Sequence, residues 1–134
     1  RARGFESVIA RHPKIDVLAT EPADWDPAKA AQLWESYLNT YSHISAAFFH
    51  NDDMAVGGLA YAQAKGIRVP EDLGIAGWGG MEAASILPKR LTTTVVPTTA
   101  IGKAAAEALV ARLKGEAGQE VTVVPTRLVP GETG

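Results

Sequence analysis

Two short apolar runs, each followed directly by a turn, constrain the fold of this chain most strongly. The first covers residues 44–49 and leads into Asn-Asp-Asp-Met-Ala at 51–55, and the second ends in Gly-Trp-Gly-Gly at 77–80. Short and almost continuously apolar runs are typical of strands buried on both faces of a parallel sheet. In open α/β sheets, ligands bind outside the carboxyl ends of the strands. We therefore expect function in these two turns.

The segment between the two runs has the chemistry of a helix. Asn51 or Asp52 can cap its first turn, and the carboxylates of Asp52 and Asp53 favour the positive end of the helix dipole. Small residues fill its middle, and Lys65-Gly66 supplies a cation and a glycine where the helix should end. The three segments together predict one strand–helix–strand unit.

The same alternation continues along the rest of the chain. We expect helices at 1–11, at 27–40 and between Thr98 or Thr99 and Gly115, a short helical piece at 81–87, and strands at 15–19, 91–96 and 121–129. Thr98 or Thr99 is the expected cap of the last helix, and Gly115 marks its end. The pattern predicts an α/β fold with a doubly wound parallel sheet. Because the chain begins in a helical pattern with no strand before it, we expect it to be a fragment of a longer protein.

Composition excludes several classes of function. The 134 residues contain no cysteine, which excludes disulfides and thiolate metal sites and is compatible with a cytoplasmic location. No apolar stretch is long enough to cross a bilayer. The net charge of −2, with lysine and arginine spread along the chain, provides no basic patch for a phosphate backbone. We expect this segment to contact neither membrane nor nucleic acid.

The sequence gives little support to catalysis. His12, His43 and His50 fall into no metal-ligand spacing. There is no Gly-x-Ser-x-Gly nucleophile turn and no Gly-x-x-x-x-Gly-Lys-Ser/Thr phosphate loop. The turn at 77–80 follows a strand but lacks the third spaced glycine of a dinucleotide fingerprint. We therefore expect no enzyme activity, no metal and no cofactor.

Six segments, taken in order and spacing, carry a resemblance to a known family. They are Arg1-Ala2-Arg3-Gly4-Phe5, Trp25, His50-Asn51-Asp52-Asp53-Met54-Ala55-Val56-Gly57, Gly66-Ile67-Arg68-Val69-Pro70-Glu71-Asp72, Leu91-Thr92-Thr93 and Ile101-Gly102-Lys103-Ala104-Ala105. The chain resembles the C-terminal part of the effector-binding core of LacI/GalR transcriptional regulators, a fold shared with periplasmic sugar-binding proteins.

The resemblance implies a two-subdomain sensor that holds a small effector, a sugar, polyol or sugar acid, in the cleft between its subdomains. Residues 1–95 would form most of the C-terminal subdomain, residues 96–122 part of the N-terminal one, and residues 123–134 a crossover strand and tail. Operator DNA would be bound by a helix-turn-helix domain that lies outside this chain, as part of a homodimer. The alternative is a transport-type solute-binding protein for a sugar, without DNA binding.

The resemblance also implies ligand contacts at three residues. Arg1 corresponds to an arginine that grips sugar hydroxyls, Trp25 to an aromatic residue that stacks on the sugar ring, and Asn51 to an amide that recognises hydroxyl groups. Each has an ordinary alternative. Arg1 could be a surface arginine in a fraying turn, Trp25 a loop residue covering the core, and Asn51 a helix cap.

Gly79 departs from the family pattern. Many sugar-binding members have an aspartate there, whereas this chain has Gly-Trp-Gly-Gly, which resembles the gluconate-type regulators. Loss of that carboxylate would reduce the repulsion that an anionic ligand meets near Arg1. A glycine-rich turn without ligand preference is the alternative.

A dimer interface is expected on the helix that follows Asn51. Its small residues allow close helix approach, and Tyr61, Ile86 and Leu87 would complete the surface by analogy with the matching region of the family. The alternative is that these residues pack on the sheet of their own subunit.

Overall fold

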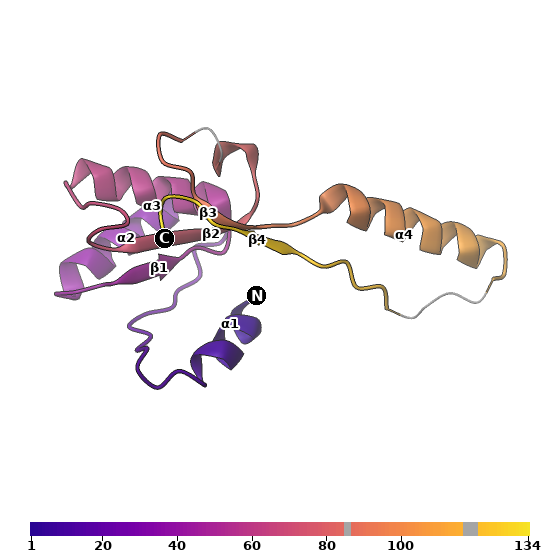
Figure 1. Ribbon diagram of the computed structural model, residues 1–134, viewed down its shortest axis with the longest axis horizontal. Coiled ribbons are helices and arrows are strands. Elements are labelled where there is room, and N and C mark those ends of the chain that lie inside the picture. Colours follow the sequence, from indigo (N-terminus) through magenta and orange to yellow (C-terminus); the bar gives the residue numbers. More distant parts are fainter. Residues whose placement is uncertain (85–86, 117–120) are drawn as a thin grey trace.

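The computed structural model describes residues 1–84, 87–116 and 121–134 (Figure 1). In chain order its elements are α1 (Ala2–Ile9), α2 (Pro27–Thr40), β1 (Ala46–Phe48), α3 (Asp52–Ala64), β2 (Gly74–Gly79), the 3-10 turn η1 (Glu82–Ala84), β3 (Thr92–Val95), α4 (Thr98–Leu113) and β4 (Arg127–Val129). The expected alternation of strands and helices is confirmed.

A four-stranded sheet with the order β1-β2-β3-β4 forms the centre of the fold. The first three strands are parallel, with Ala46 of β1 opposite Gly74 of β2 and Ala76 of β2 opposite Thr92 of β3. β4 pairs antiparallel with β3, placing Val95 opposite Arg127. The sheet is therefore dominated by parallel pairs, and its chain-terminal strand runs in the opposite direction.

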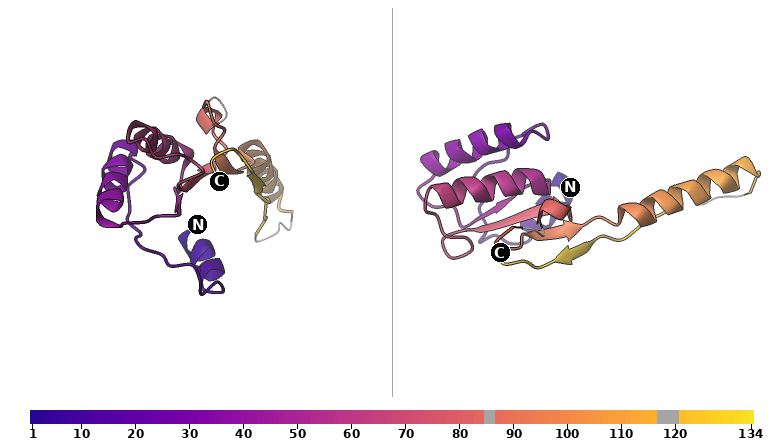
Figure 2. Two further views of the ribbon diagram at one scale, coloured as in Figure 1. Left: turned by 60° about the vertical axis from the view of Figure 1, so that its left-hand side comes forward. Right: turned by 90° about the horizontal axis from the view of Figure 1, so that it is seen from above.

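Helices cover both faces of this sheet, as the doubly wound prediction requires. Successive strand residues point to opposite faces. Phe48 stacks on Phe5 of α1 with ring centroids 5.8 Å apart, whereas the next aromatic, Phe49, meets Trp34 of α2 edge-on at 5.9 Å. α3 lies beside α2, and a Cβ at its Gly58 would fall 2.4 Å from the Phe49 ring. In Figure 2, α2 and α3 lie together on one side and α1 on the other.

The hydrophobic core lies between the α2–α3 pair and the sheet. Its buried residues come from both helices, the strands and the turns that join them: Trp34, Ala55, Ala62, Val69, Leu73, Ile75, Ala84 and Leu91. Local signals start both helices. Asp26 accepts the amide hydrogen of Ala28 before α2, and Asn51 accepts that of Met54 before α3, each at 2.8 Å. The core thereby fixes the carboxyl ends of β1 and β2.

Three expectations from the sequence are wrong in detail. Residues 15–19 form no strand, because a strand requires a hydrogen-bonded neighbour and β1 does not lie beside them. The strand expected at 121–129 is confined to Arg127–Val129, where β3 offers its edge. α4 begins at Thr98 with Pro97 as its N-cap residue, and neither threonine caps it with a side-chain hydrogen bond.

α4 extends away from the rest of the molecule, and the chain leading to β4 returns beside it (Figures 1 and 2). None of its described residues is buried, and Ile101, Leu109 and Leu113 are exposed. Apolar side chains exposed along a helix are available to pack against another element.

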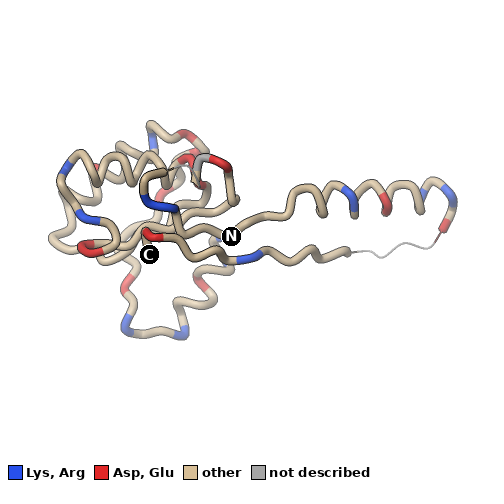
Figure 3. The backbone as a smooth tube through the Cα atoms, turned by 45° about the horizontal axis from the view of Figure 1, so that its top comes forward, with Lys and Arg blue, Asp and Glu red and all other residues tan. Residues whose placement is uncertain are grey.

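Charged residues of both signs are spread along the described chain. Figure 3 shows lysine and arginine interspersed with aspartate and glutamate over the described backbone. Among those residues, no helix is both long and apolar enough to span a membrane.

Candidate functional site

The candidate site lies at the carboxyl edge of the sheet, where β1 and β2 end and α1 begins. β1 leads through Phe49 and His50 into Asn51, and β2 leads into the Gly79-Gly80 turn. Arg1 reaches this edge from the start of α1, and its Nη1 donates a hydrogen bond to the carbonyl oxygen of His50. Residues far apart in the sequence thus meet where ligands bind in open α/β sheets.

Two tryptophans flank the Arg1 guanidinium. Its Cζ lies 4.5 Å from the ring centroid of Trp25 and 5.7 Å from that of Trp78. Both distances fall within the range of cation–π attraction. The bond to His50 and these two rings orient the arginine, so its remaining N–H groups form a donor site of fixed direction.

Trp25 is held in position by its loop rather than by the core. Its φ is +63° and that of Asp24 is +51°, a left-handed conformation that is rare for such residues. Trp25 is 60% exposed, so most of its surface is open to solvent. An exposed indole beside an oriented guanidinium offers an apolar face next to hydrogen-bond donors.

Asn51 is a helix cap, as its ordinary alternative predicted. Its Oδ1 accepts the Met54 amide hydrogen at 2.8 Å. This bond leaves the side-chain NH₂ group, with two donors, for another partner. The cap therefore fixes the orientation of the amide and does not exclude a ligand contact.

Gly79 and Gly80 both have backbone reasons for being glycine. Their φ values are +136° and +71°, and a Cβ at Gly80 would lie 2.7 Å from the Val95 side chain. The turn conformation therefore accounts for these glycines without a ligand. The role of Gly79 in ligand preference stays a prediction.

His50 lies beside the arginine, with its ring 5.2 Å from that of Phe48. Burial lowers the pKa of this histidine below its ordinary value, and the positive charge of Arg1 lowers it further. At neutral pH, Arg1 is therefore the positive side chain of this group.

Of the residues predicted for a dimer interface, the two that the structure describes both pack against the core of their own chain. The Tyr61 hydroxyl donates to Glu35 Oε1 of α2 at 2.9 Å, and the ring packs against the core. Leu87 also packs against the core, and Ile86 lies outside the described residues. The exposed part of α3 is formed by Ala60 and its neighbours Gln63 and Ala64.

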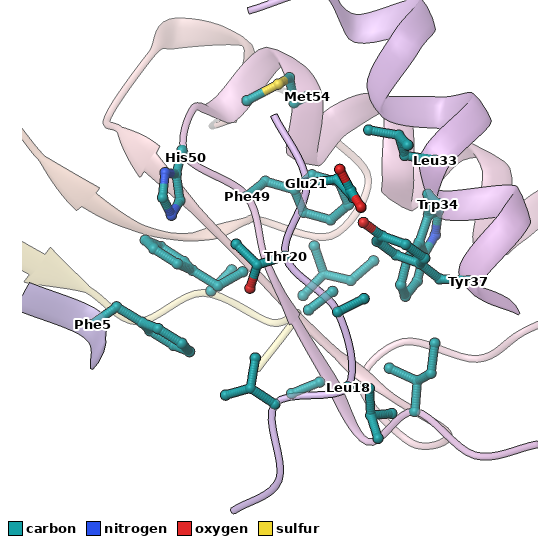
Figure 4. A pocket seen from close by; sticks show the side chains of 18 of the residues that line it. Phe5, Leu18, Thr20, Glu21, Leu33, Trp34, Tyr37, Phe49, His50 and Met54 are labelled. Carbon is teal, nitrogen blue, oxygen red and sulfur yellow. The ribbon is translucent and has the colours of Figure 1, made fainter. Parts of the chain in front are cut away.

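A cavity of about 1120 Å³ separates β1 from residues 15–25 (Figure 4). Arg1, Trp25 and His50 contribute to its lining, but most of the remainder is apolar, including Phe5, Ile9, Val17, Leu18, Leu33 and Phe48. Two further lining atoms, Trp34 Nε1 and Tyr37 Oη, are buried without a hydrogen-bond partner in the described chain. An apolar cavity beside the edge strand β1 suits a polypeptide segment better than a hydroxyl-rich ligand.

Sequence reasoning missed two residues of this region. The glycine-rich pattern at 77–80 does not single out Trp78, although an aromatic residue at the end of a strand is a signal for a ring at the sheet edge. Asp52 has the sequence signal of a helix start, yet it is fully buried and bonded to Thr93 and Met81. No short motif predicts that pairing, because Thr93 is 41 residues away.

The described residues contain no group of three or more histidine, aspartate or glutamate side chains placed to hold a metal ion. The donors at the site are a guanidinium, an amide and indole rings. Such a set can bind a polar or anionic small molecule by hydrogen bonding and stacking.

Comparison with known proteins gives consistent matches. A family model described as a periplasmic binding protein-like domain matches residues 1–133. The chain is 29% identical over 120 residues to the HTH-type transcriptional regulator GntR of Pseudomonas aeruginosa, covering 87% of this chain and 34% of that protein. It is 33% identical over 129 residues to the ribose import binding protein RbsB of Salmonella typhimurium, covering 96% of this chain and 43% of that protein.

Solved structures agree with these matches. The lac repressor dimer bound to operator and the anti-inducer ONPF superposes with a TM-score of 0.92 at 26% identity, covering 99% of this chain and 46% of that chain. The chain thus spans less than half the length of each of these proteins. It belongs to the family of periplasmic binding protein-like domains, and the proteins it resembles include LacI-type transcriptional regulators.

Proposed function

We propose that this chain is part of the effector-binding core of a LacI-type transcriptional regulator. Residues 1–95 form most of one subdomain, residues 96–122 belong to the second, and residues 123–134 cross back as a strand and tail. A small effector binds in the cleft between the subdomains and changes the affinity of a helix-turn-helix domain, outside this chain, for operator DNA in the cytoplasm. The similarity to GntR and to the operator-bound lac repressor supports this proposal.

The observation that carries the ligand site is the clustering of Arg1, Trp25 and Asn51 at one sheet edge. Arg1 lies against Trp25 and bonds to the residue before Asn51. A sugar acid fits this group: a carboxylate or hydroxyl oxygens accept from the guanidinium, the ring or chain carbons contact the indole, and the amide donates to hydroxyl groups. Gly79 adds no negative charge, so we propose an anionic sugar derivative of the gluconate type.

The experiment that tests the site is titration calorimetry of the intact protein with D-gluconate. Arg1→Ala and Asn51→Ser should each weaken binding by about 1–3 kcal/mol, because each removes a donor from a desolvated contact. Serine caps helices as well as asparagine does, so Asn51→Ser separates ligand contact from helix capping.

Arg3→Ala is the matched control for Arg1→Ala. Arg3 is exposed, lies in the helix that Arg1 precedes and carries the same charge. Its loss should leave the affinity unchanged. If Arg1→Ala and Asn51→Ser both bind D-gluconate as tightly as the unsubstituted protein, the site assignment is wrong.

The apolar cavity is the proposed place of a further strand from outside residues 1–134. It lies between the free edge of β1 and residues 15–19, whose alternating apolar side chains suit a strand that has gained a neighbour. A strand there would also supply backbone groups to partner the buried Tyr37 hydroxyl. We therefore assign the cavity to completion of the sheet, and the effector to the sheet edge.

A solute-binding protein is the second candidate function, supported by the similarity to RbsB over 96% of this chain. The two functions share the sheet edge and differ outside it. A helix-turn-helix upstream of Arg1 would favour the regulator, and a secretory leader there would favour the transport-type protein. Sequencing the upstream coding region distinguishes them.

A further inference from the structure

Asp52 is a fully buried acid that joins three elements beside the candidate site. It lies in the first turn of α3 and has no exposed surface. Its Oδ1 accepts the hydroxyl hydrogen of Thr93 in β3 at 2.6 Å, and its Oδ2 accepts the amide hydrogen of Met81 after β2 at 2.7 Å. The carboxylate thus connects the start of α3 to β3 and to the turn that follows β2.

The same carboxylate accounts for Gly77, which lies near the end of β2. A Cβ at Gly77 would lie 2.3 Å from Asp52 Oδ1, and one at Gly79 would lie 3.5 Å from Oδ2. The carboxylate therefore occupies the volume that a side chain at Gly77 would need. The backbone of residues 77–81 lies directly against Asp52, so the position of the carboxylate determines the position of the turn.

Trp78 lies between Gly77 and Gly79 at the end of β2, and its ring centroid is 5.7 Å from Cζ of Arg1. A displacement of residues 77–81 moves this ring and the adjacent backbone relative to Arg1. We propose that Asp52 is a positioning residue: it contacts no ligand, and it holds residues 77–81 where Trp78 and the turn line the ligand site. The inference rests on the proposed function for the ligand and on the observed contacts for the turn.

If Asp52 contributed to stability alone, its loss would have a different effect on the ligand site. Loss of either hydrogen bond leaves a buried polar group without a partner, which lowers stability whatever the role of Asp52. In molecules that remain folded, however, a purely structural role leaves Trp78 and the ligand site unchanged. The test must therefore measure the site in folded protein, at a temperature where circular dichroism shows every variant to be native.

The test compares two buried threonines in the intact protein. Thr93→Val removes the hydroxyl that bonds to Asp52, and Thr133→Val removes an equally buried hydroxyl that donates to the Ile75 carbonyl oxygen at 2.7 Å, near the opposite ends of β2 and β3. Thr93→Ser restores the hydroxyl, and Asp52→Ala removes both bonds at once. The readouts are acrylamide quenching of Trp78 in a Trp25→Phe background, where Trp34 is buried, and calorimetric affinity for D-gluconate in the native background.

We expect Thr93→Val and Asp52→Ala to increase the quenching of Trp78, to shift its emission to longer wavelength, and to weaken D-gluconate binding about tenfold. Thr93→Ser should recover both properties, and Thr133→Val should lose stability alone. If Asp52→Ala does not fold, the threonine variants give the answer by themselves.

The proposal is overturned if Thr93→Val and Thr133→Val lose similar stability and neither changes Trp78 quenching. If the unsubstituted protein does not bind D-gluconate, that failure belongs to the proposed ligand. The quenching of Trp78 still decides the positioning role in that case, because it requires no ligand.

Discussion

At the scale of single residues, the side chains of the candidate site make contacts within the chain and still have groups left to bind a ligand. Asn51 caps α3 with its carbonyl oxygen and retains its amide donors. Arg1 uses one N–H group to bond to His50 while both indoles contact its guanidinium. Because these contacts within the chain orient the Asn51 amide and the Arg1 guanidinium, less conformational entropy is lost when a ligand binds.

Substitutions at Gly79 can separate the effect of a negative charge on ligand binding from the effect of backbone strain on stability. Any side chain at φ +136° costs about 1–3 kcal/mol of stability, and Gly79→Asp should be destabilised more than Gly79→Asn because its carboxylate would lie near that of Asp52. Only the aspartate adds a negative charge at the site. We expect it to bind D-gluconate about tenfold more weakly than the asparagine variant does, and to differ little for the neutral analogue sorbitol.

Titration calorimetry of both variants with both ligands measures this difference. If Gly79→Asp loses the same amount of affinity for D-gluconate and for sorbitol, relative to Gly79→Asn, the lack of a carboxylate at residue 79 does not determine a preference for anions.

At the scale of elements, α3 connects the site to the surface. Its first turn carries Asn51 and Asp52, its Gly58 side packs on Phe49, and its Ala60 side is exposed. A two-fold dimer interface on this helix would therefore use Ala60 rather than Tyr61, because the Tyr61 hydroxyl bonds to Glu35 within the chain. Tyr61→Asp would place a second carboxylate beside Glu35 and disturb the α2–α3 contact, so it cannot test such an interface.

Ala60→Glu tests the proposed homodimer directly. Two-fold symmetry would place the new charges on the same patch of both subunits, and like charges in an interface oppose association. Sedimentation of the intact protein should show the dimer dissociation constant rising about tenfold or more. Gln32→Glu, an exposed change of the same charge on α2, is the control. Unchanged dimerisation of Ala60→Glu would place the interface elsewhere.

At the scale of the whole molecule, the chain consists of a packed sheet unit and a projecting arm, the helix α4. α2 and α3 bury their inner faces on the sheet, whereas α4 buries no described residue. α4 has 16 residues, and most of the stability of helices in proteins comes from tertiary packing. We therefore propose that packing against the second subdomain stabilises this arm.

Hydrogen exchange of the isolated 1–134 chain should reveal this difference. Amides of α4 should exchange nearly as fast as those of a short peptide, and amides of α3 should exchange only through larger opening of the core. In the intact protein, the second subdomain should protect α4. Equal protection of α3 and α4 in the isolated chain would contradict the assignment of the arm to another subdomain.

The sequence alone determined the α/β alternation, the limits of α2 and α3 and the sheet edge that carries the site. These features follow from local chemistry: apolar runs, Asn51 and Pro27 at helix starts, and glycine after Lys65. Similarity to the family added Arg1 and Trp25, which no local pattern singles out.

Tertiary structure decided the remainder, because the responsible contacts join distant residues. The pairing of Asp52 with Thr93 and the position of Trp78 against Arg1 depend on the order and register of the strands. Residues 15–19 have a strand pattern but form none, since a strand exists only when a neighbour satisfies its backbone. For the same reason the edge of β3 limits β4 to three residues of a longer apolar run.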